Sequence, residues 1–437
     1  MATFKTLPGF REFYPEQFAK KSYIFSCWRS AARSFGFQEF EPPVLEQLDL
    51  FTEKSGEEIK SQLFEFVDKG ERAVSLRPEM TPSLARMVGV KAAGIRKPVK
   101  WFAIGENYRY ERQQKGRLRA FYQYNADILG EQSLNADAEI IALLIDSLRA
   151  FGLNESQFKL RLGDRNLWVL FLQNFGVDDS RMTQVLSVID KLEKVSPEAL
   201  LEMMIVALSG SGLSAEKLIS DIKILVSLRS IDELEQFFKS TAQDSDGISA
   251  RIADWRMLLD LLAGLSVAQF VSIDMGIVRG LAYYTGFVFE AFQTVGSGRA
   301  LAGGGRYDNL VGKLGYQDMP AVGFGMGDVT VGDLLELVGL EKSDDFSPEV
   351  YVVIGAESVR KNALEVVRIL RASGKRVDYP LKSTGFGKQF KQADAVGAKF
   401  AVIVGEDEVA KAVVKVKNLK TAEEQEVSIS DIVSAVA

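Results

Sequence analysis

The stretch Val278-Arg279-Gly280-Leu281-Ala282-Tyr283-Tyr284-Thr285-Gly286 puts one arginine and two adjacent tyrosines on a short glycine-containing segment. Aromatic and β-branched residues follow from Phe287 to Phe292, a composition that predicts a strand. A glycine run, Gly303-Gly304-Gly305-Arg306-Tyr307-Asp308, comes next. Because no Lys followed by Ser or Thr completes it, the run is not a phosphate-binding P-loop. By itself it indicates only a flexible turn.

A second polar segment runs from Tyr108-Arg109-Tyr110-Glu111-Arg112 through Lys115-Gly116-Arg117 to Phe121-Tyr122-Gln123 and Asp127. Its pattern predicts a strand, a basic loop and a second strand, and exposed basic hairpin tips are common. The functional hypothesis is that the guanidinium groups of Arg109 and Arg117 hold phosphates, while Phe121 offers its face to a base. Gln123 and Asp127 then share one strand face by the period of two.

A third segment, Leu76-Arg77-Pro78-Glu79-Met80-Thr81, places a carboxylate and a hydroxyl on a loop stiffened by proline. Glu79 and Thr81 are a suitable acceptor pair for a substrate ammonium group. The alternative is a helix start, with Thr81 as the cap and Pro82 at the first helical position.

The composition restricts the chemistry, since the 437 residues include no histidine and one cysteine, Cys27. Hydrolase triads that need an imidazole base are excluded, as are zinc sites built from Cys and His. A net charge of −6 gives no global sign of nucleic-acid binding. Neither a secretory signal nor an apolar run of membrane-spanning length is visible, so a cytoplasmic protein is expected.

Periodicity along the chain predicts helices, strands and three domains. Helical spacing predicts one helix from Lys20 to Ser34. A second helix is predicted after Asn135, its expected N-cap, and ends at Gly152. Strands are expected at Gln38 to Leu45, Val99 to Gly105 and Phe287 to Phe292, in a mixed antiparallel sheet. The domain prediction is a body of residues 1–166 and 269–338, a helical insertion of residues 167–268, a linker from Leu340 to Pro348, and a small, largely parallel α/β domain of residues 348–437.

Together, the three polar segments closely resemble the catalytic motifs of histidyl-tRNA synthetases. Arg279-Gly280-Leu281 with Tyr283-Tyr284 resembles the family's histidine-binding signature, and Gly304 to Asp308 resembles its second part. The stretch from Phe40 to Glu46 is similar to the dimer-forming first motif of class II synthetases. In the tail, Lys388 to Asp394 and Val404 to Glu408 are similar to the family's anticodon-binding domain.

This resemblance implies an α+β catalytic domain with the antiparallel sheet of class II synthetases, a helical insertion and a C-terminal α/β anticodon-binding domain. The enzyme would join L-histidine to ATP and pass the histidyl group to tRNA(His), as a homodimer, with Mg²⁺ bound to ATP and without zinc or another protein-held metal.

The resemblance also assigns roles to individual residues. Arg279 and Arg109 would be catalytic and act at the α-phosphate. The amino acid would be bound by Glu79, Thr81, Gln123, Asp127, Tyr283, Tyr284 and Tyr307, with Asp127 and Tyr284 on the two imidazole nitrogens. ATP would be bound by Arg109, Glu111, Arg117, Phe121 and Arg279, with Arg117 on the outer phosphates and Phe121 stacked on adenine.

Three positions depart from the family pattern. Asp127 stands where Glu is frequent, and Ala282 stands where Asp is frequent. Val322 to Gly327 resembles the start of the third class II motif, but Thr330 occupies the place of its ATP-binding Arg. Thr330 and Ala282 leave open a catalytically inactive, synthetase-like regulatory subunit of histidine biosynthesis, although such paralogues typically lack the tail domain.

Synthetases for proline, glycine or threonine are a further alternative, and the segment from Arg279 to Thr285 argues against all three. The threonine enzyme's pocket uses a zinc ion that this chain cannot ligate with Cys and His. The absence of histidine suggests one more hypothesis: the chain can be translated when charged histidyl-tRNA is scarce, with lineage drift as the alternative explanation.

Overall fold

A computed structural model describes residues 4–52, 60–111, 118–192, 194–241, 246–279 and 283–437. The chain divides into two compact units, residues 1–343 and 344–437. The boundary falls inside the polar stretch that the sequence predicted as a linker. None of the described helices is long and apolar enough to cross a membrane.

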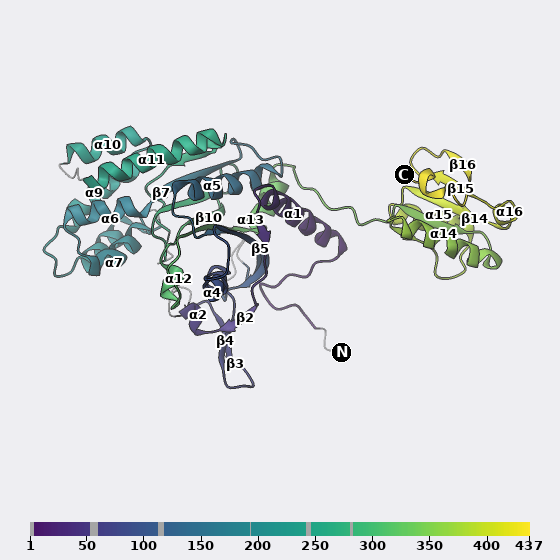
Figure 1. Ribbon diagram of the computed structural model, residues 1–437, viewed down its shortest axis with the longest axis horizontal. Helices are drawn as coiled ribbons and strands as arrows, with labels where there is room; N and C mark the ends of the chain where they lie inside the picture. The colour runs from purple at the N-terminus through teal and green to yellow at the C-terminus, as the bar shows by residue number, and fades with distance from the viewer. Residues whose placement is uncertain (1–3, 53–59, 112–117, 193, 242–245, 280–282) are drawn as a thin grey trace. The chain divides into compact units, whose positions relative to one another are not determined.

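An eight-stranded sheet forms the centre of the first unit (Figure 1), in the order β1-β5-β6-β11-β10-β9-β7-β8. Neighbours from β5 to β7 are antiparallel, whereas β1 on β5 and β8 on β7 are parallel, which confirms the expected mixed antiparallel sheet. In sheet order the strands are Gln38–Glu39, Val99–Tyr108, Ala120–Leu129, Ala321–Gly327, Ala300–Arg306, Phe287–Gln293, Phe158–Asp164 and Val271–Ile273.

The glycine run lies inside strand β10, so the prediction of a flexible turn is wrong. Close packing of neighbouring strands explains the glycines. A Cβ added to Gly304 would lie 2.1 Å from the carbonyl oxygen of Gly323 on β11. A Cβ on Gly303 would meet Nη1 of Arg279 at 1.5 Å. The run therefore lets other groups approach the sheet surface closely.

Three helices lie against one face of the sheet: α1 Pro15–Ser34, α5 Leu134–Arg149 and α13 Asp328–Leu337. The predicted helix from Lys20 to Ser34 is confirmed as the larger part of α1. Tyr124 of β6 points to this face, and its ring stacks on Trp28 of α1 with 5.4 Å between the centroids. The predicted N-cap of α5 is wrong, because the helix begins at Leu134 after Ser133, and Asn135 lies in its first turn.

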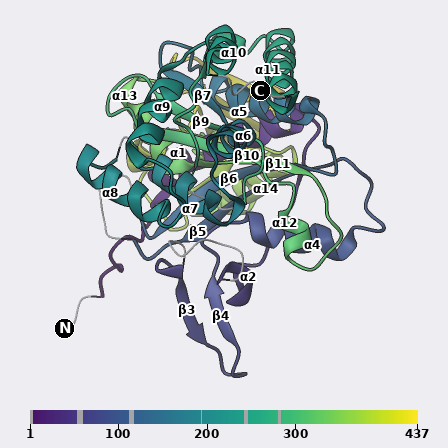
Figure 2. The same cartoon turned by 90° about the vertical axis from the view of Figure 1, so that its left-hand side faces the viewer.

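Six helices follow one another between residues 165 and 264 in the described part of the chain: α6 Arg165–Phe175, α7 Asp179–Ile189, α8 Pro197–Ala207, α9 Ala215–Ser227, α10 Ile231–Ser240 and α11 Asp246–Gly264 (Figures 1 and 2). The expected helical content is present, and α6 begins two residues before the predicted start of the insertion. Helix α11 packs on α5, and the buried side chains of both belong to one apolar core. The assignment of an independent subdomain stays a prediction.

A small sheet of three strands, in the order β2-β4-β3, leads into the polar segment from Leu76 to Thr81 (Figure 1). Its strands are β2 Leu45–Gln47, β3 Phe64–Val67 and β4 Ala73–Leu76, with α2 Asp49–Thr52 after β2 and α4 Thr81–Lys91 after β4. The single strand predicted from Gln38 to Leu45 is wrong. Pro42 and Pro43 lack the N–H groups that a continuous ladder needs, and the chain divides there into β1 and β2.

The second unit carries a five-stranded sheet in the order β13-β12-β14-β15-β16. The parallel strands β13 Val377–Asp378, β12 Val350–Ile354 and β14 Phe400–Val404, with helices α14 Arg360–Ala372 and α15 Phe386–Ala395, agree with the sequence prediction. Two antiparallel strands, β15 Val413–Asn418 and β16 Glu424–Ser428, were not predicted. Short helices, α12 Leu310–Lys313 in the first unit and α16 Glu406–Ala410 and α17 Ile432–Ala435 in the second, complete the fold.

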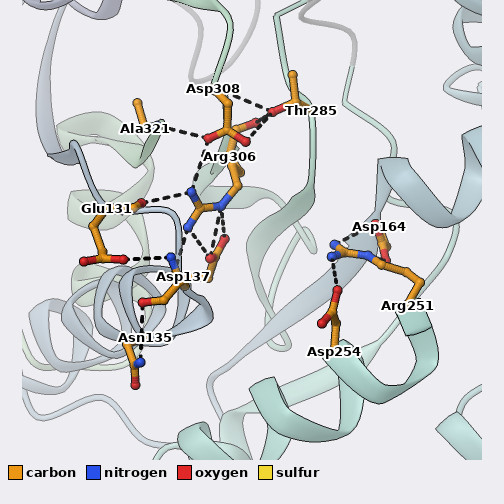
Figure 3. A network of polar contacts seen from close by, with 11 residues as sticks. Glu131, Asn135, Asp137, Asp164, Arg251, Asp254, Thr285, Arg306, Asp308 and Ala321 are labelled. Atoms are coloured by element: carbon orange, nitrogen blue, oxygen red, sulfur yellow. Dashed lines mark hydrogen bonds and ion pairs between the residues drawn. The ribbon is translucent and has the colours of Figure 1, made fainter. Parts of the chain in front are cut away.

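A buried polar network fixes the end of β10 (Figure 3). Nε of Arg306 donates to both carboxylate oxygens of Asp137 on α5 at 3.1 Å, and Nη2 donates to the same carboxylate. Nη1 donates to Oδ1 of Asp308 at 3.2 Å and to the carbonyl oxygen of Glu131 at 3.1 Å. The side chain of Asp137 is fully buried, so its charge is compensated by protein groups alone.

We predict that Asp137→Ala lowers the free energy of unfolding of the first unit by about 3–5 kcal/mol, because it leaves the Arg306 charge buried and unpaired. Urea denaturation followed by tryptophan fluorescence measures this unit selectively, since Trp28, Trp101, Trp168 and Trp255 all lie within it. The matched control is Asp146→Ala on the same helix, whose ion pair with Arg149 is exposed; it should cost at most about 0.5 kcal/mol. Equal losses for both variants would contradict the prediction.

Candidate active site

A cavity of about 70 Å³ opens on the sheet face opposite α1; we call it the first cavity. Its lining includes all nine residues that the sequence predicted to bind the amino acid or to be catalytic: Glu79, Thr81, Arg109, Gln123, Asp127, Arg279, Tyr283, Tyr284 and Tyr307. They come from three segments far apart in the chain. The fold brings these segments together, and the individual roles of the residues remain predictions.

Strand β6 supplies the floor of the first cavity, where Gln123, Asn125 and Asp127 share one face by the period of two. The facing positions on β11 are glycines, and they leave room for these side chains. A Cβ on Gly323 would lie 1.8 Å from Oδ1 of Asp127, and one on Gly325 would lie 2.7 Å from Nε2 of Gln123.

Asn125 was missed by the sequence analysis, although the same period places it between Gln123 and Asp127. Its side chain is buried, and its Oδ1 has no hydrogen-bond partner in the described part of the chain. An open acceptor in a cavity wall is a feature that a ligand donor satisfies. Asn125 therefore joins the candidate binding residues.

Asp127 is held by Tyr307, whose hydroxyl donates to Oδ1 at 2.6 Å. The second carboxylate oxygen, Oδ2, is buried and has no partner among the described residues. Burial raises the pKa of Asp127 to about 7, although the hydrogen bond from Tyr307 opposes the rise. The carboxylate thus offers one free acceptor whose charge depends on pH near neutrality.

Glu79 forms a second acceptor in the same cavity. The hydroxyl of Tyr283 donates to its Oε2 at 3.1 Å, while Oε1 is buried and unpartnered within the described structure. Burial raises the pKa of Glu79, and the charges of Arg109 and Arg279 and the bond from Tyr283 oppose this. Thr81 is the first residue of α4, and the N-cap position belongs to Met80; the alternative that Thr81 caps the helix is therefore wrong.

Arg279 enters the first cavity with open donors. Its Nε and Nη1 are buried and make no hydrogen bond to any residue that the structure describes. The nearest ion-pair partner is Glu290, with 3.7 Å between Nη1 and Oε1, and the ring centroid of Tyr284 lies 5.6 Å from the guanidinium carbon. An anionic ligand group in the cavity would satisfy these donors.

A second cavity, of about 200 Å³, shares Arg109 with the first. Its other lining residues are Glu111, Leu118, Phe121, Gly327, Asp328, Val329 and Thr330. Nε of Arg109 donates to the carbonyl oxygen of Pro78 at 3.0 Å, and its guanidinium carbon lies 5.5 Å from the ring centroid of Phe121. Arg109 therefore stands at the meeting point of the two cavities.

The predicted ATP-binding residues Arg109, Glu111 and Phe121 line the second cavity, and Arg279 lines the first. Thr330, at the position of the missing arginine, also lines the second cavity. Arg117 and Ala282 lie outside the described residues.

Comparisons with known proteins find similarities over nearly the whole chain. A family model described as Histidyl-tRNA synthetase matches residues 9–329, and one described as Anticodon binding domain matches residues 349–437. A histidine–tRNA ligase from Opitutus terrae is 50% identical over 98% of this chain and 96% of its own length. The crystal structure of histidyl-tRNA synthetase from Nostoc sp. PCC 7120 is similar with a TM-score of 0.78 at 25% identity, covering 100% of this chain and 99% of that chain.

A further solved structure is described as an ATP phosphoribosyltransferase regulatory subunit/histidyl-tRNA synthetase from Bacillus halodurans C. It has a TM-score of 0.72 at 22% identity and covers 93% of this chain and 99% of that chain. At this identity the likeness concerns the fold alone.

We predict that Asp127→Asn stabilises the ligand-free protein more at pH 8 than at pH 4.5. The raised pKa means that the folded state binds the proton more tightly than the unfolded chain, whose Asp pKa is near 3.9. Wild-type stability is therefore lost as pH rises from about 4 to about 7, and the amide variant does not incur this loss. The thermal unfolding midpoints of both proteins across this range measure the difference, and a difference that does not change with pH would refute the prediction.

Proposed function

The chain belongs to the histidyl-tRNA synthetase family and is an aminoacyl-tRNA ligase, and on that premise we propose how its residues carry out the reaction. L-Histidine and ATP form histidyl-adenylate and pyrophosphate in the two cavities, and the histidyl group then passes to tRNA(His). One observation carries the proposal: nine residues from three distant segments line one small cavity, and it contains buried acceptors and donors that the described residues leave without a partner.

The first cavity is proposed to bind histidine. Glu79 and Thr81 accept hydrogen bonds from the α-ammonium group, and Gln123 orients the amino acid. Asp127 and Tyr284 bind the two imidazole nitrogens, and Tyr307 holds the Asp127 carboxylate in place. The open oxygens of Glu79 and Asp127 support this assignment, because an amino acid without a side-chain donor would leave the Asp127 oxygen buried and unpaired.

The second cavity is proposed to bind the nucleotide, with Phe121 stacked on adenine and Arg109 on the α-phosphate. A histidine carboxylate oxygen attacks the α-phosphorus, the bond from that phosphorus to the bridging oxygen of the β-phosphate breaks, and pyrophosphate leaves. Arg109 and Arg279 stabilise the negative charge that develops on the α-phosphate oxygens. The open Nε and Nη1 atoms of Arg279 support its role.

No protein histidine is needed in this scheme, in agreement with a chain that has none. The nucleophile in the first step is a carboxylate that is already ionised, so no general base has to activate it. In the second step a hydroxyl of the terminal adenosine of tRNA attacks the acyl carbon, and the bond from that carbon to the phosphate oxygen breaks. AMP leaves, and its phosphate takes the proton of the hydroxyl.

Magnesium is proposed to arrive bound to ATP. This ion typically uses one or two carboxylates together with substrate phosphates. Glu111, which lines the second cavity, is placed to contribute such a carboxylate. When bound, the ion would neutralise part of the phosphate charge.

The missing third-motif arginine leaves Arg109 as the basic side chain among the described residues that line the second cavity. Asp328 in the same lining is already paired with Arg11, with 2.8 Å between Nη2 and Oδ2. We therefore propose that Arg117 binds the outer phosphates and compensates for Thr330.

The regulatory-subunit alternative is not favoured. The chain has the second unit that matches the anticodon-binding model, and Arg109 and Arg279 both line the first cavity. The family and its anticodon-binding domain support tRNA(His) as the partner, and a cytoplasmic location is proposed with it.

We propose that the protein works as a homodimer, as the resemblance of Phe40 to Glu46 to the first class II motif implies. The small β2-β4-β3 sheet exposes the large apolar side chains of Leu45, Phe66 and Val67, and Val44 just before β2 is exposed too. We propose that a partner subunit covers these side chains. Light scattering on the eluting peak of a sizing column should give about twice the chain mass. A monomeric mass at micromolar concentration would rule out a stable dimer.

We predict that the purified protein exchanges labelled pyrophosphate into ATP with histidine and with none of the other amino acids. Arg279→Ala should reduce the exchange rate by about 100- to 1000-fold, the usual loss for one group that stabilises a developing oxyanion. Arg161→Met serves as the control, because Arg161 is half-exposed on β7, contacts Asp274 and Phe292, and lines neither cavity. Folded protein that binds histidine but exchanges nothing would make the regulatory alternative the better one.

A further inference from the structure

The backbone of Arg279 adopts a conformation that a side chain normally avoids. Its φ is +57°, in the left-handed region, where a residue other than glycine is strained by about 1–3 kcal/mol. Such a conformation persists only when the surrounding structure holds it. The groups that bind this backbone therefore decide where the Arg279 guanidinium points.

Arg165, the first residue of α6, donates one hydrogen bond to the Arg279 backbone and one to the backbone of Gly286. Its Nη1 donates to the carbonyl oxygen of Arg279 at 3.3 Å. Its backbone N–H donates to the carbonyl oxygen of Gly286 at 3.0 Å. One residue thus bonds to both ends of the segment from Arg279 to Gly286. Arg165 itself is buried, with 9% of its surface exposed, so water does not readily replace it as the donor.

Arg165 is fixed in turn by the residue before it. The carboxylate of Asp164 caps α6, accepting from the backbone N–H groups of Asn166 at 2.9 Å and Leu167 at 3.2 Å. The same carboxylate accepts from Nε of Arg251 at 2.6 Å and from Nε1 of Trp255 at 2.8 Å, both on α11 (Figure 3 shows the arginine). The start of α6 is therefore held by β7, by its own cap and by α11.

We propose that Arg165 is a positioning residue for Arg279: it holds the Arg279 carbonyl, maintains the left-handed backbone and thereby aims the guanidinium at the reacting phosphate. The inference rests on the catalytic role proposed for Arg279. Arg165 lines neither cavity among the described residues, so it acts through Arg279 and not on substrate.

A guanidinium suits this position because it is planar, its donors have a fixed geometry and its charge is delocalised, so it can donate to a carbonyl in a buried environment. Burial lowers the pKa of Arg165, and the carboxylate of Asp190 at the end of α7 is the largest charge effect opposing this. Arg165 thus lies at the start of α6, is affected by the charge of Asp190 at the end of α7, and follows Asp164, to which α11 bonds. A displacement of α6 would alter the Arg279 backbone directly.

The test compares Arg165→Met and Arg165→Lys with wild type in histidine-dependent pyrophosphate exchange, giving kcat and the KM values for histidine and ATP. Arg165→Met should lower kcat by about 10- to 100-fold, the scale of a small misplacement of a catalytic group. Its KM values should change less than about threefold, since the binding residues remain. Arg165→Lys keeps the charge and should recover part of kcat. The control Arg161→Met, on the preceding strand, should behave as wild type.

A double-variant cycle with Arg279→Ala separates positioning from a general structural effect. If Arg165 acts through Arg279, Arg165→Met should cost little once Arg279 is alanine. The same loss of kcat in both backgrounds, or a large rise in KM with unchanged kcat, would overturn the inference. Full activity of Arg165→Met beside an inactive Arg279→Ala would also overturn it while leaving the proposed function intact. An active Arg279→Ala would instead refute the role of Arg279.

Tryptophan fluorescence in urea shows whether each variant is folded before kinetics are measured. Should Arg165→Met fail to fold, Arg165→Lys carries the same cycle, with a kcat loss expected only when Arg279 is present.

Discussion

Arg306 and Asp137 meet in the interior between β10 and α5, where water cannot solvate either charge. A buried ion pair contributes little net stability, because the desolvation of two charges offsets their attraction. Its effect is on geometry: a buried charge without its partner is strongly destabilising, so the pair fixes the position of Arg306 relative to Asp137. The end of β10 is thereby fixed to α5, and the bond from Arg306 to Asp308 extends the constraint to β11, since Asp308 also accepts from the backbone of Ala321.

Tyr307 lies between Arg306 and Asp308 in the chain, and its hydroxyl donates to the carboxylate of Asp127. The network therefore places the hydroxyl that orients the candidate imidazole acceptor. It reaches the Tyr284 side of the first cavity as well, because the backbone N–H of Thr285 donates to the carbonyl oxygen of Arg306 at 2.8 Å. The first cavity differs from this network, because several of its polar groups are not paired. Glu79, Asn125, Asp127 and Arg279 all keep buried polar atoms that have no hydrogen-bond partner among the described residues. A protein can tolerate such unsatisfied groups where a rigid surrounding holds them ready for a ligand.

The sequence predicted most of the site because its residues cluster in three short motifs, and the period of two on β6 set their direction. The elements that it missed depend on contacts between distant parts of the chain. The glycines of β10 looked like a turn, and only the approach of β11 and Arg279 explains them. Asn135 looked like a cap, but Ser133 precedes the helix and α5 starts one residue before Asn135. Arg165 gave no signal, since its bond to Arg279 depends on the packing of α6 beside the sheet. The polar, exposed strand β16 lacks the apolar alternation by which a strand is recognised.

The two candidate catalytic arginines lie next to different strands: Arg109 follows β5, and Arg279 precedes β9. Three strands, β6, β11 and β10, lie between β5 and β9 in the sheet. The separation of the two guanidinium groups therefore depends on the register of the sheet, which a local fluctuation does not change. It also depends on the backbone contacts that hold each arginine. Arg109 is held by the carbonyl of Pro78, and Arg279 by Arg165. Two like charges kept in one cavity repel each other, and an anion between them relieves that repulsion. In the proposed mechanism the α-phosphate of ATP would supply this anion. The negative charge on its oxygens would increase as the carboxylate attacks, so the attraction would be greatest in the transition state.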